Sequence, residues 1–283
     1  MEIGIQWPLV LFTVIAGSGF GLAMMTGIAR IVAKQDKSLR QIALVAAFIL
    51  MVVGGLMSVF HLSHPERFMA AIANLFSFSG IALELIGLIL GCAAVALFFV
   101  LSTAENEMGE KVLAVCCVVI GVVAALLQGF AYFEVGAQAG WHMVPLPLSY
   151  LLTSLAAGAA IYLALAAVKG AEAEAQVLTG KIVMALAALG AVAAIAYVGN
   201  LAAAGLLEGG ALTVGAVTVA VAVVAFALGA WFAFKSQTTG LAVGAAVLCV
   251  GASLVVRVLM WVVAEVDLNL IAEAAANRGL FLF

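Results

Sequence analysis

Long apolar runs follow one another along this chain, separated by short polar segments. A helix needs about twenty mostly apolar residues to cross the hydrocarbon core of a bilayer, so each run predicts one transmembrane helix. The fold class is therefore all-α, a polytopic transmembrane bundle of eight helices, and 1–283 is expected to be a single transmembrane domain. The expected spans are 8–32, 41–60, 81–102, 112–133, 147–168, 181–204, 212–234 and 240–264.

The composition excludes several classes of protein. Hydrophobic residues make up 67% of the chain and charged residues only 9%, whereas about a quarter of the residues in a soluble domain are charged. The net charge of -3 leaves no basic stripe with which to bind phosphates, so no nucleic-acid partner is expected. The partner of most of this surface is the lipid bilayer.

Basic residues predict the orientation, because loops on the cytoplasmic side are enriched in Lys and Arg. One set of connections carries or borders eight of them: Arg30, Lys34, Lys37, Arg40, Lys111, Lys169, Lys181 and Lys235. Only Arg67 and Arg278 belong to the other set. Both termini are therefore expected on the outer, periplasmic side. The first helix lacks signal-peptide features and is expected to be retained, and the tail 265–283 is expected to lie along the outer interface.

Polar groups gather toward that outer side. They are His61, His64, Glu66, Arg67, Glu84, Glu134, Trp141, His142, Arg257, Glu265 and Asp267. Ionisable groups inside a bilayer are costly and mark candidate functional sites. A quinol loses two protons as it loses two electrons, and neutral histidine and carboxylate are suitable proton acceptors. The cluster thus favours a quinol site near the outer interface.

Each residue also has a simpler structural explanation. His61 is suited to capping a helix at the interface, Glu84 to being an outward-facing charge at a helix end, and His64 to a solvated loop. His142, beside Trp141, fits an interfacial anchor as well as a ligand. A buried Arg257 needs an anionic partner or a bound polar head group, and a salt bridge that fixes helix packing would be its structural role.

Neither haem nor metal is expected in this chain. A bis-histidyl haem needs facing histidines at membrane depth, and none of the expected spans has a histidine in its interior. No HxxH or HExxH pattern beyond His61 and His64 supports zinc. The cysteines, all inside apolar runs, are interpreted as core residues.

The sequence resembles the membrane-anchor subunit of dimethyl sulfoxide reductase-type molybdopterin oxidoreductases. The resemblance rests on the opening Gln6-Trp7-Pro8-Leu9-Val10-Leu11-Phe12-Thr13, on His61-Leu62-Ser63-His64-Pro65-Glu66-Arg67, on Glu84 and on Arg257. It implies a multi-pass subunit of the bacterial inner membrane that oxidises menaquinol. It also implies two partners: a four-cluster iron–sulfur electron-transfer subunit, and a catalytic subunit that carries molybdopterin.

The resemblance also implies roles for single residues. His61 matches the family histidine at the quinol site, Arg67 the arginine six positions later, Glu84 an acidic position and Arg257 the arginine of the last helix. We therefore expect His61 and Glu84 to be catalytic, and His61, His64, Arg67, Glu84 and Arg257 to bind quinol. The sequence departs from the family where Ser63 replaces the usual glycine, where His64 is an extra histidine, and where Leu259-Met260-Trp261 replaces an aromatic pair.

Two other functions remain open from the sequence. A secondary transporter or channel favours broken helices and ionisable residues at the midplane, but the four prolines, at positions 8, 65, 145 and 147, all fall near the ends of the expected spans. A purely structural tether would bind the same partners without handling quinol. Copurification of an iron–sulfur protein distinguishes an anchor from a transporter, and quinol binding distinguishes it from a tether.

Overall fold

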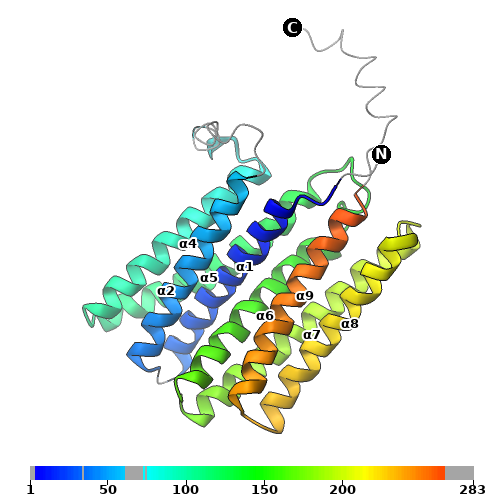
Figure 1. Ribbon diagram of the computed structural model, residues 1–283. Helices are drawn as coiled ribbons and strands as arrows, with labels where there is room; N and C mark the ends of the chain where they lie inside the picture. The colour runs from blue at the N-terminus through cyan, green and yellow to red at the C-terminus, as the bar shows by residue number, and fades with distance from the viewer. Residues whose placement is uncertain (1–3, 34, 61–72, 74, 265–283) are drawn as a thin grey trace.

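A computed structural model describes residues 4–33, 35–60, 73 and 75–264 (Figure 1). Its elements are α1 (Trp7–Val32), α2 (Lys37–Val59), the short 3-10 helix η2 (Leu75–Ser77), α4 (Gly80–Thr103), α5 (Glu107–Phe133), α6 (Pro145–Val168), α7 (Ala173–Ala203), α8 (Gly209–Phe234) and α9 (Thr239–Val262). Within these described ranges, eight helices are long and apolar enough to cross a membrane. The predicted all-α bundle of eight spans is therefore confirmed.

Several helices extend beyond the apolar runs that predicted them. The helix α5 starts five residues before the expected span because its polar first turn is capped by Asn106, whose side chain accepts a hydrogen bond from the Gly109 amide. Asp36 caps α2 in the same way by accepting from the Leu39 amide. A capped polar turn satisfies free backbone amides in water. The apolar runs thus identify the part of each helix in lipid, and the caps identify where the helix begins.

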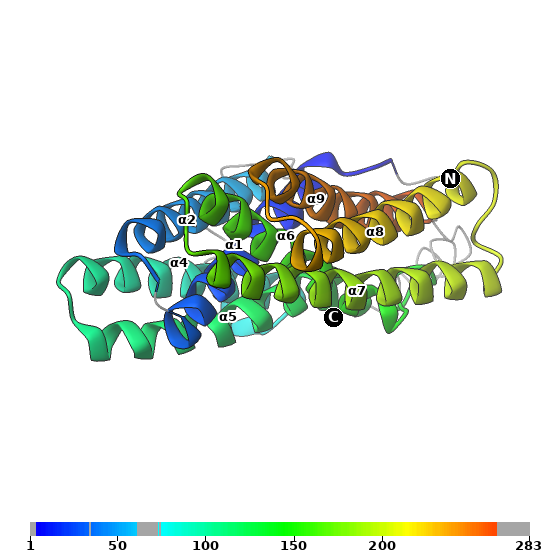
Figure 2. The same ribbon diagram turned by 90° about the horizontal axis from the view of Figure 1, so that it is seen from below.

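The bundle consists of two halves that meet along α1 and α6. In the first half, α1 packs on α2 and α5, and α4 packs on α5. In the second half, α6 packs on α7 and α9, and α8 also packs on α7 and α9. Figure 2 shows α2 and α4 at one side of the bundle and α8 at the other. At the seam, a Cβ added to Gly158 would meet backbone atoms of Gly21 and Leu22. Small residues therefore allow these two backbones to touch, as is common between helices in lipid.

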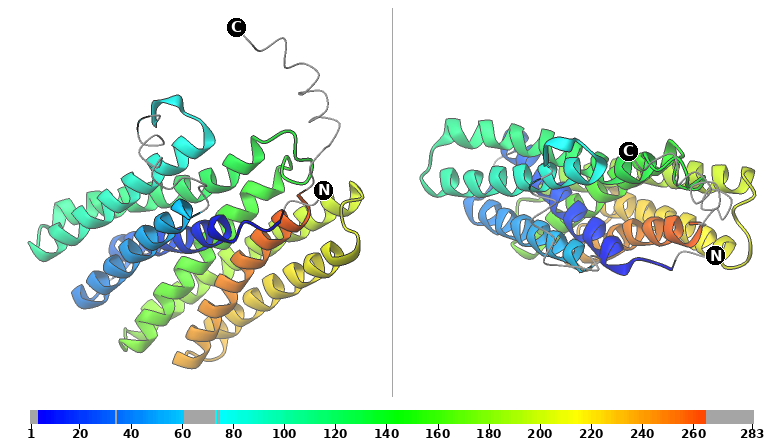
Figure 3. Two further views of the ribbon diagram at one scale, coloured as in Figure 1. Left: turned by 45° about the horizontal axis from the view of Figure 1, so that its top comes forward. Right: turned by 90° about the horizontal axis from the view of Figure 1, so that it is seen from above.

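The starts of α1, α4, α6 and α8 and the ends of α2, α5, α7 and α9 share one end of the bundle, called the upper end after its place in Figure 1. Figure 3 shows the same end from above. Every described Lys and Arg except Arg257 lies at the opposite, lower end. This distribution is the one expected if the lower end faces the cytoplasm.

Three charged residues form a buried network at the lower end. Arg30 Nε donates to Glu110 Oε2 at 2.6 Å, and Arg40 Nη2 donates to Glu110 Oε1 at 3.1 Å. Arg40 Nε also donates to Ser102 Oγ at 3.0 Å. One carboxylate thus joins α1 and α2 to α5.

Candidate functional site

The predicted site residues divide into two groups. His61, His64 and Arg67 lie outside the described residues. Glu84 and Arg257 are described, and both lie near the upper end. Glu84 is four residues into α4 and Arg257 is five residues before the end of α9, which places them about 6 and 8 Å from those helix ends at 1.5 Å per residue.

Arg257 is fully buried where α1, α6 and α9 meet, with 0% of its surface exposed. Its Nε donates to Thr13 Oγ1 at 3.0 Å, and its Nη2 donates to Ser154 Oγ at 2.8 Å. Its Nη1 donates to Ser253 Oγ at 2.7 Å and to the Ser253 carbonyl oxygen at 2.8 Å. The face of the Tyr150 ring lies against the cation, with 4.1 Å between the guanidinium carbon and the ring centroid. Its Nη1 also donates to Thr153 Oγ1 at 3.4 Å, and its Nη2 to the Thr13 carbonyl oxygen at 3.3 Å. Six oxygen atoms and one aromatic ring on three helices thus surround one charge.

The salt bridge considered for Arg257 is not formed with any described residue. Hydroxyl groups take the place of the anion, and two of them donate their own protons to carbonyl oxygens of their own helices. The hydroxyl of Thr13 donates to the carbonyl oxygen of Leu9 at 3.1 Å, and that of Thr153 to the carbonyl oxygen of Ser149 at 2.6 Å. Each oxygen therefore presents lone pairs to the guanidinium. The positive charge itself stays without an anionic contact among the described residues.

An aromatic cluster lies above Arg257 toward the upper end. Trp141 packs edge-on against both Tyr132 and Trp261, with ring centroids 5.4 and 5.0 Å apart, and Tyr132 also packs against Tyr150 at 5.7 Å. The Trp141 indole donates from Nε1 to the Met260 carbonyl oxygen at 2.8 Å. Edge-to-face packing of this kind orders large side chains firmly. Trp141 is thus a buried member of this cluster and not an exposed interfacial anchor.

His142 lies apart from this cluster. Its side chain is exposed, its Nδ1 lies 2.7 Å from the Phe133 carbonyl oxygen, and its ring stacks on the Phe133 ring at 4.6 Å. These contacts are local to the loop between α5 and α6. They support the anchoring interpretation of His142 over a ligand role.

Glu84 points into the bundle and not outward. It shares a helix face with the buried residues Gly87 and Gly91 of α4, and its Oε1 is buried without a hydrogen-bond partner among the described residues. Glu84 and Arg257 both lie within electrostatic range of Tyr132 and Tyr150. The carboxylate and the cation therefore lie near the same pair of tyrosines.

Two more buried polar groups lack partners among the described residues. Gln128 of α5 is 1% exposed with neither amide atom paired, and the Nε1 of Trp261 is likewise unpaired. A Cβ built on Gly17 would lie 2.5 Å from Ser154 Oγ and 2.9 Å from Gln128 Oε1, so Gln128 adjoins a ligand of Arg257. An unpaired buried polar group costs about 1–3 kcal/mol. Three such groups near one buried cation are typical of a site that binds a polar ligand.

The sequence did not single out Gln128, Tyr132, Tyr150 or Ser154, and it pointed to Thr13 only as the last residue of the opening segment that carries the resemblance. One signal was available, because each is a polar or amphipathic residue in the half of its span nearest the upper end. Among the described residues no group of three or more His, Cys, Asp or Glu side chains is arranged to hold a metal ion.

A comparison with curated proteins gives no match. A comparison with protein-family models gives a match over residues 1–263 to the DMSO reductase anchor subunit (DmsC) family. The matched residues include all eight membrane helices and both described site residues, Glu84 and Arg257. The chain belongs to the DMSO reductase anchor subunit family and is a multi-pass membrane anchor.

Proposed function

We propose that this anchor oxidises menaquinol at its upper end. The observation that carries the proposal is the buried, unpaired carboxylate oxygen of Glu84, which lies with the buried Arg257 within electrostatic range of Tyr132 and Tyr150. A buried carboxylate without a hydrogen-bond donor is able to accept a proton from a ligand hydroxyl. A fixed guanidinium stabilises negative charge that develops on the same ligand.

The proposed chemistry divides between the two ligand oxygens. A quinol that becomes a quinone releases two protons and two electrons. Glu84 accepts one proton, and His61, which lies outside the described residues, accepts the other. Tyr150 and Arg257 hold the head group and offset the charge that forms as each proton leaves. His64 and Arg67, also outside the described residues, are proposed to complete the binding site.

The electrons are proposed to leave from the same end of the protein. The family description names an anchor subunit of DMSO reductase. We infer that a four-cluster iron–sulfur subunit docks over the upper end and passes electrons to a molybdopterin subunit that acts on the final substrate. We propose that the protein lies in the bacterial inner membrane with its upper end outside. The protons from quinol are then released on the outer side, which is also the side from which the electrons leave. Turnover is then electroneutral.

The substitution Glu84→Gln tests this assignment. It keeps the size of the side chain and removes the proton acceptor, and loss of a general base costs on the order of 100-fold in rate. The assay is oxidation of a reduced menaquinol analogue by membranes that contain the complete complex. Glu134→Gln is the matched control, because Glu134 is an exposed carboxylate at the same end of the bundle.

The two variants separate quinol chemistry from anchoring. We expect Glu84→Gln, like His61→Ala, to assemble with its partners and to lose quinol oxidation, while Glu134→Gln retains it. Assembly is measured as the amount of iron–sulfur subunit that copurifies. Wild-type quinol oxidation by Glu84→Gln would contradict the proposed role and leave the chain as a tether.

A further inference from the structure

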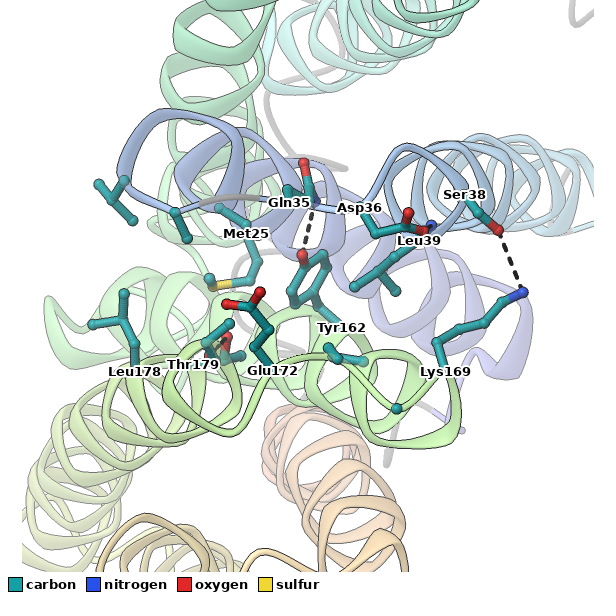
Figure 4. Close-up of a pocket in the computed structure, with 17 residues that line it drawn as sticks. Met25, Gln35, Asp36, Ser38, Leu39, Tyr162, Lys169, Glu172, Leu178 and Thr179 are labelled. Atoms are coloured by element: carbon teal, nitrogen blue, oxygen red, sulfur yellow. Dashed lines mark hydrogen bonds between the residues drawn. The ribbon is translucent and has the colours of Figure 1, made fainter.

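A cavity of about 650 Å³ lies at the lower end, far along the bundle from the proposed quinol site. It opens between the two halves, where the connection from α1 to α2 meets the connection from α6 to α7 (Figure 4). The quinol chemistry uses none of its lining residues. Its volume falls within the range of about 300–1,000 Å³ that is usual for small-molecule sites.

Hydrogen-bond acceptors dominate the polar wall of this cavity. Gln35 donates from Nε2 to the Tyr162 hydroxyl at 2.7 Å, and its Oε1 is buried with no partner among the described residues. Figure 4 shows the Glu172 carboxylate pointing toward Met25 and Tyr162, inside the cavity. Asp36 adds a second carboxylate, one oxygen of which already accepts from the Leu39 amide at 2.9 Å. The two carboxylates suit a ligand with several N–H donors, as a primary ammonium group has.

One cation lies at the edge of the same wall. Lys169 Nζ donates to Ser38 Oγ at 3.4 Å, and its position at the end of α6 leaves the ammonium exposed. Among the described residues, the charged lining groups are thus two carboxylates, Asp36 and Glu172, and one ammonium. This wall repels a head group that carries only negative charge. It complements a zwitterion whose ammonium faces the acids and whose phosphate faces Lys169.

Most of the remaining lining is apolar and reaches the surface of the bundle. Val32 at the end of α1 is 56% exposed and Leu178 of α7 is 38% exposed, and both line the cavity. In a membrane these faces contact acyl chains. A ligand with a charged head and apolar tails therefore has its head inside the cavity and its tails along the α1 and α7 surfaces.

We propose that this cavity binds the head group of a phospholipid with a primary amine, of the phosphatidylethanolamine type. The ammonium donates to Glu172 and Asp36, and the phosphate accepts from Lys169. Such a lipid joins the two connections across the seam between α1 and α6. The site is independent of quinol oxidation.

Lipid titration of the purified full-length chain in mild detergent, followed by native mass spectrometry, tests this site. The probes are phosphatidylethanolamine, phosphatidylcholine and phosphatidylglycerol with identical acyl chains. Because a hydrogen bond to a charged group contributes about 1.5–3 kcal/mol, the first phosphatidylethanolamine should bind at least about tenfold more tightly than the other two. Equal affinity for all three lipids, or a preference for phosphatidylglycerol, would overturn the proposal.

Two substitutions with matched controls locate the site. Glu172→Gln should reduce the affinity for phosphatidylethanolamine to that for phosphatidylcholine. Lys169→Gln should reduce the affinity for both phosphatidylethanolamine and phosphatidylcholine. The controls are Glu174→Gln and Lys235→Gln, which change exposed charges at the lower end that do not line the cavity. An equal loss of lipid affinity in a variant and in its control would overturn the assignment. Soluble glycerophosphoethanolamine should compete weakly, and competition as strong as that of the lipid would show that the tails are not bound.

Discussion

The guanidinium carbon of Arg257 lies 4.1 Å from the centroid of the Tyr150 ring. This contact gives a buried cation a neutral partner where no described carboxylate touches it. A cation on an aromatic face gains about 2 kcal/mol or more once water is excluded. The hydroxyls around it hold the guanidinium in one orientation without neutralising its charge. Arg257 therefore remains available to stabilise negative charge on a ligand.

Arg257→Met separates a catalytic role from a structural one. The substitution removes a buried charge together with its desolvation penalty, and the hydroxyl of Thr13 keeps its acceptor at Leu9. We expect a thermal midpoint within a few degrees of wild type, and quinol oxidation lowered on the order of 100-fold, as for loss of one electrostatic stabiliser. Differential scanning fluorimetry in detergent and the quinol assay measure the two effects. Normal turnover would remove Arg257 from the site.

Gly158→Ala should weaken the seam between the two halves. Its added methyl group would meet backbone atoms of Gly21 and Leu22, which cannot rotate away. Overpacking of this kind costs about 1–3 kcal/mol, and the thermal midpoint should fall. The control is Gly199→Ala in α7, where an added Cβ has no atom within 4 Å and alanine favours the helix by up to about 1 kcal/mol. An unchanged midpoint for Gly158→Ala would show that α1 and α6 separate easily.

The membrane helices could be predicted because lipid imposes one requirement on every span. The surroundings of Arg257 could not, since they depend on which helices become neighbours. Thr13 and Ser154, which accept its hydrogen bonds, lie 244 and 103 positions away in the chain. An isolated serine or threonine in an apolar run is common, because its hydroxyl bonds the carbonyl of its own helix. Only the packing of α1 and α6 on α9 brings these hydroxyls together around one guanidinium.

Glu84 shows the same division between sequence and structure. Its type and its place near a span end were sufficient to select it as a candidate. The direction of the Glu84 side chain depends on how α4 packs. The face of α4 that carries its glycines is turned toward α5, where Gly87 lies against Ala124. That packing turns the carboxylate inward, so the outward-facing charge considered for this residue is wrong.

Lys37 and Glu105 form an exposed ion pair that should make a small, pH-dependent contribution. Their side chains lie 2.7 Å apart, Nζ to Oε1, and the hydrogen bond and charge of Lys37 lower the pKa of Glu105 below its ordinary value of 4.5. A carboxyl group whose pKa is lower in the folded protein than in the unfolded chain stabilises the fold at pH values above its unfolded-state pKa. This stabilisation is lost as the pH falls through the folded-state pKa. The difference in thermal midpoint between wild type and Lys37→Gln should therefore be present near neutral pH and vanish in acid. Salt should also reduce it, since both groups are exposed. A difference that grows on acidification would contradict this sign.

Glu110→Gln should destabilise the lower end of the bundle more than any exposed substitution there. Arg30 and Arg40 each donate to a different oxygen of the Glu110 carboxylate, and the neutral amide would leave two cations together without an anion. Removing one partner of a buried ion pair costs about 3–5 kcal/mol, with the lower part of the range expected because Arg30 is 18% exposed at its side chain. Glu107→Gln is the control, since Glu107 is an exposed carboxylate in the same first turn of α5. Thermal unfolding of both variants in detergent measures the difference. Equal midpoints would mean that the network at the lower end contributes no net stability and that helix packing alone holds α1, α2 and α5 together.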